Sequence, residues 1–364
     1  MIPEGTRYHL PPEAAARLEL EEGWRFLFAS WGYEPVELPA LEVYDPAHPL
    51  AARAFKMVDK SGQVLALRAD FTTAVIRMLN DARLSGLHRF QYAGRLWLRD
   101  SEVGPGRMRE FSQVGLEAVG ASSPRLDAEL LELAWEALEL AGLSGARLEV
   151  GMPALVADLL AATGLPAGKR AALHAAIERK NTPELDELLE KYGVSGALRK
   201  VLLALPDLYG GREVLAGARS LCAGLPAEND LDWLEEVLGY LPGRLEVLLD
   251  LGMARAYDYY SGIHFRAYTP DFGLPLLGGG RYDGAGTDYA AGFALGLERV
   301  LEARGLPRRE GEPGVLALDP AAARRLRRRG LRVELAWTDD LEELRAYARE
   351  RGLKIVIADG EVEP

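Results

Sequence analysis

The sequence predicts an α+β fold built around a mainly antiparallel sheet with flanking helices. Short strand-like segments and helical segments follow one another without the strict alternation that parallel α/β folds require. A helical block of about 153–241 interrupts the strand-forming segments, and a small α/β unit occupies 314–364. The sequence contains neither a Walker phosphate-binding loop nor a dinucleotide-binding fingerprint, so we expect neither of those nucleotide-binding folds.

One helix and several short strands are expected in the first third of the chain. Leu18, Trp24 and Phe28 stand among polar positions and predict an amphipathic helix over 12–30 that stops near Gly32. Strand-forming segments 56–58 and 64–68 flank a turn at 59–62 and predict a hairpin. The elements expected after it are a helix at 71–83, strands at 88–99 and 108–119, and a helix at 126–141.

Strand character returns after the helical block. The glycine-dense stretch Gly278–Gly284 has two interpretations, a phosphate cradle or a tight connection between strands that requires positive φ. The expected elements are strands at 245–251, 264–268, 274–277 and 290–297 and a helix at 296–304, then a tail with strands at 315–318, 331–336 and 353–358 and helices at 320–329 and 339–351.

Composition narrows the function. The formal net charge of −12 lowers the expectation of obligatory RNA binding, because an RNA-binding surface is usually basic. Cys222 is the only cysteine, which excludes an intrachain disulfide, and the five histidines show no metal-ligand spacing, so we expect surface or packed histidines and no metal or cofactor. The N-terminus lacks the features of a signal peptide, and no apolar run reaches membrane length, so a cytoplasmic protein is expected.

Several segments resemble one class II aminoacyl-tRNA synthetase family, the histidyl-tRNA synthetases, in the right order over 1–305. The segment over 12–39 is similar to class II motif 1, which implies a dimer interface. The other matching segments are Leu67–Thr72, Gly106–Glu117 (motif 2), Arg255–Tyr260 and Gly279–Gly284 (the two histidine motifs), and Ala291–Arg299 (motif 3).

The resemblance implies a pocket for free histidine. Asp70, Thr72 and Gln113 would hold the α-amino group, and Glu117 with Tyr260 would bind the imidazole ring. These residue types suit the ligand, because an ammonium group needs carboxylates and neutral acceptors whereas a carboxylate pairs best with a guanidinium. The residues that complete the implied site are Arg255, which would face the carboxylate, Arg99 and Tyr259.

The chain departs from an active synthetase in its ATP loop and its C-terminal tail. After Arg99, the glutamate that binds adenine in the family is replaced by Ser101, unless a register shift lets Asp100 or Glu102 take its place. The resemblance implies a vestigial nucleotide-binding set of Arg99, Arg109, Phe111 and Arg299. The tail of 314–364 resembles a truncated anticodon-binding domain. Its arginine cluster is either an RNA-facing surface or a solvated helical face, and we favour the latter; the members are Arg324, Arg325, Arg327, Arg328, Arg329 and Arg332.

This combination resembles the family of ATP phosphoribosyltransferase regulatory subunits. The resemblance implies a chain without catalytic residues of its own that senses histidine, activates a short-form ATP phosphoribosyltransferase catalytic subunit and forms a homodimer within a hetero-oligomer. It also implies no binding of tRNA and no membrane attachment. The alternatives are an active histidyl-tRNA synthetase and a stand-alone amino-acid-binding paralogue of the synthetases.

Overall fold

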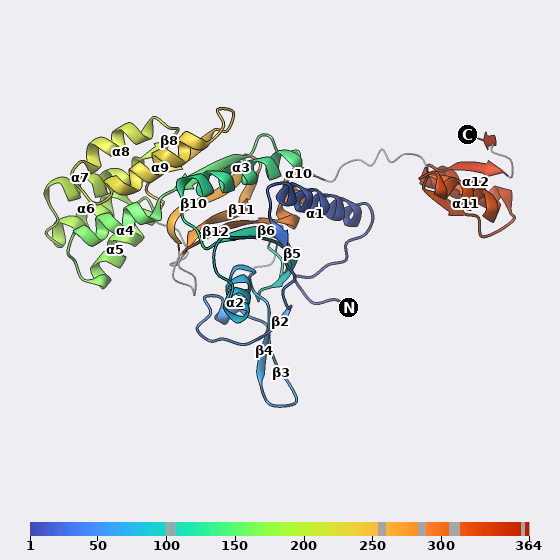
Figure 1. Cartoon of the computed structure of the whole chain (residues 1–364), viewed down its shortest axis with the longest axis horizontal. Coiled ribbons are helices and arrows are strands. Elements are labelled where there is room, and N and C mark those ends of the chain that lie inside the picture. Colours follow the sequence, from blue (N-terminus) through green and yellow to red (C-terminus); the bar gives the residue numbers. More distant parts are fainter. Residues whose placement is uncertain are drawn as a thin grey trace. The chain divides into compact units, whose positions relative to one another are not determined.

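A large, mostly antiparallel sheet forms the centre of the computed structural model (Figure 1). The structure describes residues 1–99, 104, 107–253, 260–282, 289–305, 314–357 and 361–363. Within these, the chain divides into two units, Met1–Leu306 and Pro307–Pro364, and the large sheet belongs to the first. The predicted fold class, an α+β fold around a mainly antiparallel sheet with flanking helices, is confirmed.

Nine strands of the described residues make up this sheet. Its pairs are antiparallel except β1–β5 and β7–β9, which are parallel. The strands, in order across the sheet, are β1 (Glu34–Pro35), β5 (His88–Trp97), β6 (Glu110–Val119), β12 (Ala290–Gly296), β11 (Phe272–Tyr282), β10 (Tyr260–Thr269), β7 (Arg147–Gly151), β9 (Val247–Asp250) and β8 (Tyr209–Gly210).

Helices α1 (Glu13–Ser30), α3 (Pro124–Leu140) and α10 (Leu297–Arg304) pack with one face of the sheet in the larger hydrophobic core. In α1 the residues Ala16, Leu20, Trp24 and Phe28 recur every four positions, so they form the buried stripe of the amphipathic helix. The indole nitrogen of Trp24 donates a hydrogen bond of 2.8 Å to the carbonyl of residue 137, which fixes α1 against α3.

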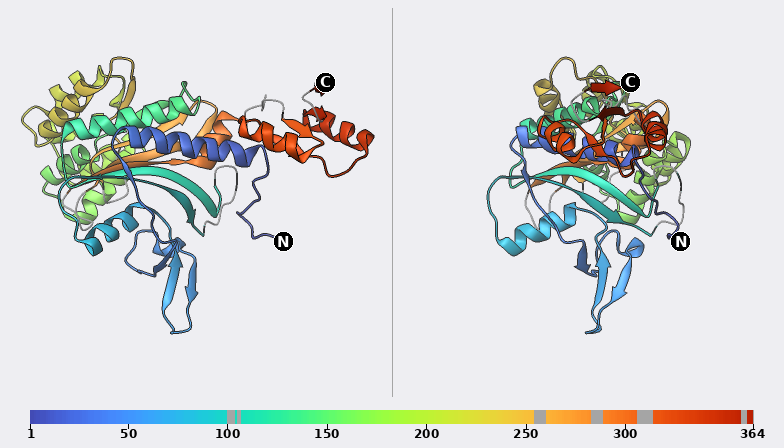
Figure 2. Two further views of the ribbon diagram at one scale, coloured as in Figure 1. Left: turned by 45° about the vertical axis from the view of Figure 1, so that its right-hand side comes forward. Right: turned by 90° about the vertical axis from the view of Figure 1, so that its right-hand side faces the viewer.

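The opposite face of the sheet carries α2 (Thr72–Ala82) and a small sheet of three strands (Figure 2). The small sheet has the order β2 (Leu41–Val43), β4 (Val64–Leu67), β3 (Lys56–Val58), and a short 3₁₀ helix at Ala51–Arg53 precedes β3. A second hydrophobic cluster joins α2 to the sheet, for example through Val75 and Tyr92. This is the face on which the candidate site lies.

Six helices follow β7 and form the block that the sequence predicted over about 153–241. They are α4 (Pro153–Ala162), α5 (Ala167–Glu178), α6 (Thr182–Lys191), α7 (Gly196–Ala204), α8 (Val214–Cys222) and α9 (Glu228–Tyr240), with a 3₁₀ turn at Leu205–Asp207. A buried ion pair ties this block to the sheet: Asp127 of α3 accepts hydrogen bonds from Arg281 of β11 and from the indole of Trp233 of α9.

The C-terminal unit has its own small sheet and core. The sheet order is β14 (Val333–Leu335), β13 (Val315–Ala317), β15 (Lys354–Ile357), β16 (Glu361–Glu363), with β16 antiparallel to β15. Helices α11 (Pro320–Arg328) and α12 (Leu341–Arg351) cover it. Asp319 caps α11 and Asp340 caps α12 by accepting hydrogen bonds from the first free backbone N–H groups.

Two kinds of feature differ from the sequence-based expectations. Strands β2, β7, β8 and β16 were not predicted, and the glycines Gly278–Gly280 do not lie in a turn. These glycines lie inside β11 and pair with β10 on one side and β12 on the other. None of the three has a positive φ, so the interpretation of this part of the stretch as a tight connection between strands was wrong. Asp283 and Gly284 lie outside the described residues.

In the described part of the chain, no helix combines the length and the apolar character needed to cross a membrane.

Candidate functional site

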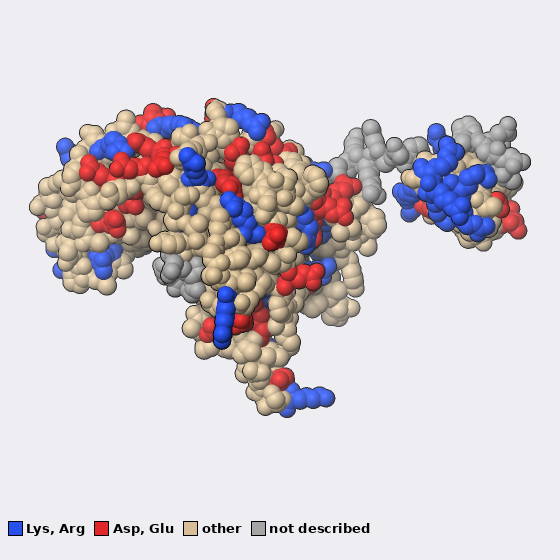
Figure 3. Space-filling view, in the orientation of Figure 1, with Lys and Arg blue, Asp and Glu red and all other residues tan. Residues whose placement is uncertain are grey.

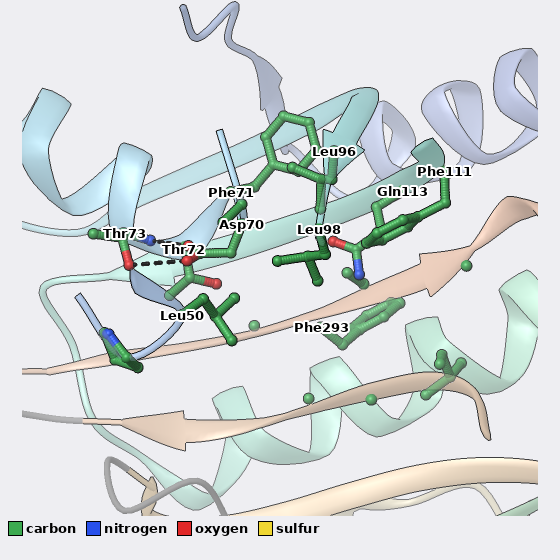
Figure 4. A pocket seen from close by; sticks show the side chains of 18 of the residues that line it. Leu50, Asp70, Phe71, Thr72, Thr73, Leu96, Leu98, Phe111, Gln113 and Phe293 are labelled. Atoms are coloured by element: carbon green, nitrogen blue, oxygen red, sulfur yellow. Dashed lines mark hydrogen bonds between the residues drawn. The ribbon is translucent and has the colours of Figure 1, made fainter. Parts of the chain in front are cut away.

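A cavity of about 790 Å³ lies between the sheet and the segment that carries α2 (Figure 4). Its volume is within the range of small-molecule sites, about 300–1,000 Å³. Asp70 and Thr72 enter it from the start of α2, and Phe111 and Gln113 enter it from β6. The cavity therefore collects side chains that are far apart in the sequence.

A row of small residues crosses the sheet face on which the cavity lies. Opposed residues of an antiparallel pair point to the same face, and the register places Glu117 of β6, Gly292 of β12, Gly280 of β11 and His264 of β10 in one row across the sheet. Gly151 of β7 continues this row beside His264.

Each glycine of this row leaves space that a neighbour needs. A Cβ on Gly292 would overlap the Glu117 carboxylate and the carbonyl oxygen of residue 116. A Cβ on Gly280 would lie 2.9 Å from the ring of Tyr260, and one on Gly151 would lie 2.6 Å from the Cβ of Met253. The row of Gly151, Gly280 and Gly292, hereafter the glycine row, thus allows the close packing of the side chains above it. Of these three glycines, Gly292 lines the cavity.

Glu117 is the most enclosed acidic residue of the cavity, with only 1% of its surface exposed. Its Oε1 accepts hydrogen bonds from the hydroxyls of Thr72 (2.7 Å) and Tyr92 (3.2 Å), and its Oε2 accepts one from the hydroxyl of Tyr282 (2.8 Å). Burial raises the pKa of Glu117 to about 7, although these three hydrogen bonds act in the opposite direction.

Asp70 is held by the local fold around α2. Just before it, the Arg68 guanidinium donates to the carbonyls of Leu38, Pro39 and Arg95, which anchors the chain at this turn. Asp70 Oδ1 then accepts from the backbone N–H of Thr73 at 2.7 Å and so caps the first turn of α2. The carboxylate stays partly exposed, with 24% of the side chain accessible.

Two histidines that were not predicted as site residues line the same cavity. His48 Nε2 lies 2.7 Å from Asp70 Oδ2. His264 is buried, its Nδ1 lies 3.1 Å from Met253 Sδ, and its ring packs against Tyr260 at 4.6 Å. Burial lowers the pKa of His264 to about 3, with a smaller contribution from Arg266, so this ring is neutral in the fold.

The structure brings together five of the eight residues predicted to bind histidine. Asp70, Thr72, Gln113, Glu117 and Tyr260 all line the cavity. Arg99 is exposed and is not among the lining residues. The two others, Arg255 and Tyr259, lie outside the described residues.

The predicted nucleotide-binding set is divided. Phe111 and Arg299 line the cavity, and Arg299 also donates to the carbonyl of Pro275 at 3.0 Å. Arg99 and Arg109 are absent from the lining, and Arg109 approaches Glu4 at 3.5 Å. The structure thus assembles only half of that set around the cavity.

Tyr92 and Tyr282 are site residues that the sequence analysis missed. Tyr282 belongs to the motif Gly279–Gly284. Alternate residues of a strand face the same side, so Tyr282 could have been assigned to the same face as Gly278 and Gly280. Tyr92 lies two positions from Gly94 on β5, so both face the same side of the sheet. A single glycine is weaker evidence for a cavity face than the run of glycines on β11.

Elsewhere in the described residues, no cluster of three or more His, Cys, Asp or Glu side chains could hold a metal ion. Figure 3 shows basic side chains gathered over the C-terminal unit. The six arginines at 324, 325, 327, 328, 329 and 332 are all exposed, on and just after α11.

Comparison with known proteins places the chain in a family. A family model described as histidyl-tRNA synthetase matches residues 5–300. The ATP phosphoribosyltransferase regulatory subunit of Thermus thermophilus is 58% identical over 361 residues, which cover 99% of this chain and 98% of that protein. The regulatory subunit of Deinococcus radiodurans is 47% identical, over 97% of this chain and 87% of that protein.

Solved structures agree on the fold. A Bacillus halodurans protein described as an ATP phosphoribosyltransferase regulatory subunit/histidyl-tRNA synthetase superposes with a TM-score of 0.84 at 24% identity, over 99% of this chain and 98% of that chain. A histidyl-tRNA synthetase from Nostoc superposes with a TM-score of 0.82 at 19% identity, over 99% of this chain and 92% of that chain. At these identities the likeness concerns the fold alone.

Proposed function

Because the chain belongs to the family of ATP phosphoribosyltransferase regulatory subunits, we propose that it binds free histidine in the cavity and transmits this state to a separate, short-form catalytic subunit. The partner chain carries out the condensation of ATP with phosphoribosyl pyrophosphate, the first step of histidine biosynthesis. The regulatory chain activates that partner and, with histidine bound, inhibits it. Both chains act in the cytoplasm.

The observation that carries this proposal is the enclosed set of acceptors around Glu117 and Asp70. A free amino acid presents an ammonium group and, in histidine, a ring with one donor and one acceptor when neutral. Asp70, Thr72 and Gln113 suit the ammonium group, and Glu117 with Tyr260 suits the ring. A buried polar site of this kind rejects ligands that lack the matching groups by about 10⁴-fold or more.

The proposal also includes the other residues that were predicted to bind histidine or a nucleotide. Arg255 pairs with the ligand carboxylate, and Tyr259 and Arg99 complete the histidine site. Phe111, Arg299, Arg99 and Arg109 are remnants of a nucleotide site that no longer supports catalysis in this chain. The chain binds no tRNA on this proposal, because its formal net charge is −12 whereas an RNA-binding surface is usually basic.

Regulation requires histidine to bind the two activity states of the complex with different affinities. A coupling free energy of about 1–3 kcal/mol is typical of such linkage.

The decisive experiment combines three measurements on the purified chain. We expect calorimetric binding of histidine, no histidine-dependent exchange of pyrophosphate into ATP, and a complex with a short-form catalytic subunit whose activity rises on mixing and falls when histidine is added. Robust pyrophosphate exchange would instead identify a synthetase. Histidine binding with neither a complex nor a change in activity would identify a stand-alone binding protein.

We also propose that the chain pairs with a second copy through α1. Leu18 and Phe26 lie eight positions apart on this helix, which is close to two turns, and are 61% and 79% exposed. Two large apolar side chains exposed on one helical face are suited to an interface.

A further inference from the structure

The segment between β2 and β3 closes one side of the cavity and carries His48. Residues Asp45, Ala47, His48, Pro49 and Leu50 of this segment all line the cavity. The His48 side chain is only 10% exposed, so it is an inner part of this wall.

The hydrogen bonds of His48 fix which ring nitrogen carries the proton. The backbone N–H of Leu50 donates to Nδ1 at 3.0 Å, so Nδ1 must have a free lone pair. In the neutral ring the proton is therefore on Nε2, which lies 2.7 Å from Asp70 Oδ2 and donates to it. His48 thus connects the segment between β2 and β3 to the carboxylate at the start of α2.

Asp70 is consequently held from two sides. Its Oδ1 accepts from the backbone N–H of Thr73 at 2.7 Å, and its Oδ2 accepts from His48 and, at 3.3 Å, from the hydroxyl of Thr73. An ionised carboxylate has about four acceptor positions, so about one remains on Oδ1. Because the other positions are occupied, the direction of that remaining lone pair is fixed.

We infer that His48 is a positioning residue that orients Asp70 toward the ammonium group of an amino-acid ligand. This inference rests on the proposed function, and it adds a specificity determinant that acts through Asp70 without touching the ligand. Its Nε2 is already engaged with Asp70 and its Nδ1 with Leu50. Removal of His48 therefore weakens binding only of ligands that carry the ammonium group.

The test compares two ligands and three variants of the full chain. The ligands are histidine and imidazole-4-propionate, which has the same ring and carboxylate but no ammonium group. The variants are His48→Ala, His48→Gln, whose side-chain amide can still donate to Asp70, and the control His174→Ala, which alters a histidine of α5 outside the cavity. Affinities come from calorimetry for histidine and ligand-observed NMR for the weaker ligand, with thermal unfolding as the check on folding.

We expect His48→Ala to weaken histidine binding by about tenfold and to leave imidazole-4-propionate binding within about twofold of the wild type, because one charged hydrogen-bond partner loses its orientation. His48→Gln should recover most of the histidine affinity, and His174→Ala should change neither affinity.

The opposite results are equally clear. An equal loss for both ligands in His48→Ala, or no recovery in His48→Gln, means that His48 merely supports the cavity wall and overturns the inference. Unchanged histidine affinity in His48→Ala overturns it as well, while the proposed function stands. If the wild type binds neither ligand, the proposed function fails and the inference fails with it.

Discussion

The carboxylate of Glu117 accepts hydrogen bonds from three different elements. Its donors are Thr72 of α2, Tyr92 of β5 and Tyr282 of β11, so they occupy three of about four acceptor positions. The position left is on Oε2, which lies over Gly292 in the space that a Cβ would otherwise fill. A ring N–H of a bound ligand has one well-defined place to donate.

The pKa of about 7 makes this acceptor sensitive to pH. The carboxyl is buried, which raises its pKa, so it is protonated below pH 7 and cannot then offer all its lone pairs. We expect histidine affinity to increase with pH by up to about tenfold per unit below pH 7 and to level off above it. Calorimetric titrations between about pH 5.5 and 8 measure this directly.

Glu117→Gln is the matched variant for that experiment. Its amide does not titrate, so we expect weaker binding with a flatter pH dependence, in which only the ligand ring itself still titrates. If wild-type affinity stays constant over this range, Glu117 does not act as the ring acceptor.

Sequence reasoning found cavity residues only where a family motif suggested them, and it did not find every residue of those motifs. Asp70, Thr72, Gln113, Glu117 and Tyr260 were all predicted, and all line the cavity. The missed lining residues include Tyr282, which lies inside a motif, and Tyr92, His48 and His264, which lie outside the motifs. His48 is in a segment without periodic pattern, and its partner Asp70 is 22 positions away (70 − 48), so only the tertiary fold reveals the pair.

The glycine row predicts a sharp difference between two glycines of the same cavity floor. Gly292→Ala places a methyl group against the Glu117 carboxylate and a backbone oxygen of β6, and such overpacking costs about 1–3 kcal/mol. We expect a lower unfolding temperature and a loss of histidine affinity of at least about tenfold, since Glu117 must move.

Gly278→Ala is the control, because its Cβ would have no neighbour closer than 4.0 Å. This variant should unfold at the wild-type temperature. Equal unfolding temperatures for both variants would show that the floor tolerates side chains and that the row is incidental.

Strands and helices were predictable where the apolar period was regular. The helices α1, α2, α3 and α10 lie close to their predicted bounds, because each has a buried stripe. The strand β11 was predicted only as far as 277, since three glycines lack strand propensity. Their extended conformation results from pairing with β10 and β12, which no local pattern reports.

Over the whole chain, the contacts that unite distant segments were the least predictable part. Arg281 and Asp127 are 154 positions apart, and the pair is almost fully buried. Arg281 and Tyr282 are neighbours on β11, and successive strand residues face opposite sides. One strand therefore carries both a cavity hydroxyl and the anchor of the helical block, which neither composition nor motif spacing indicates.

The proposed dimer contact through α1 can be tested by substituting an exposed residue of this helix. We expect the wild-type chain to sediment as a dimer and Phe26→Glu to sediment as a monomer, because a charge would then be buried at the interface. Tyr240→Glu, which alters an exposed aromatic of α9, is the control and should remain dimeric. Identical masses for the two variants would place the contact elsewhere or remove it.

The bare backbone beneath the cavity also limits how its ligand preference could be redesigned. A glycine has no side chain to shorten, so no substitution at Gly278 or Gly292, which both line the cavity, can deepen the space. A bulkier amino acid could be admitted only by trimming the surrounding walls, which come from α2, from the segment around His48 and from β10. Substitutions meant to broaden the range of ligands should therefore be made in these walls.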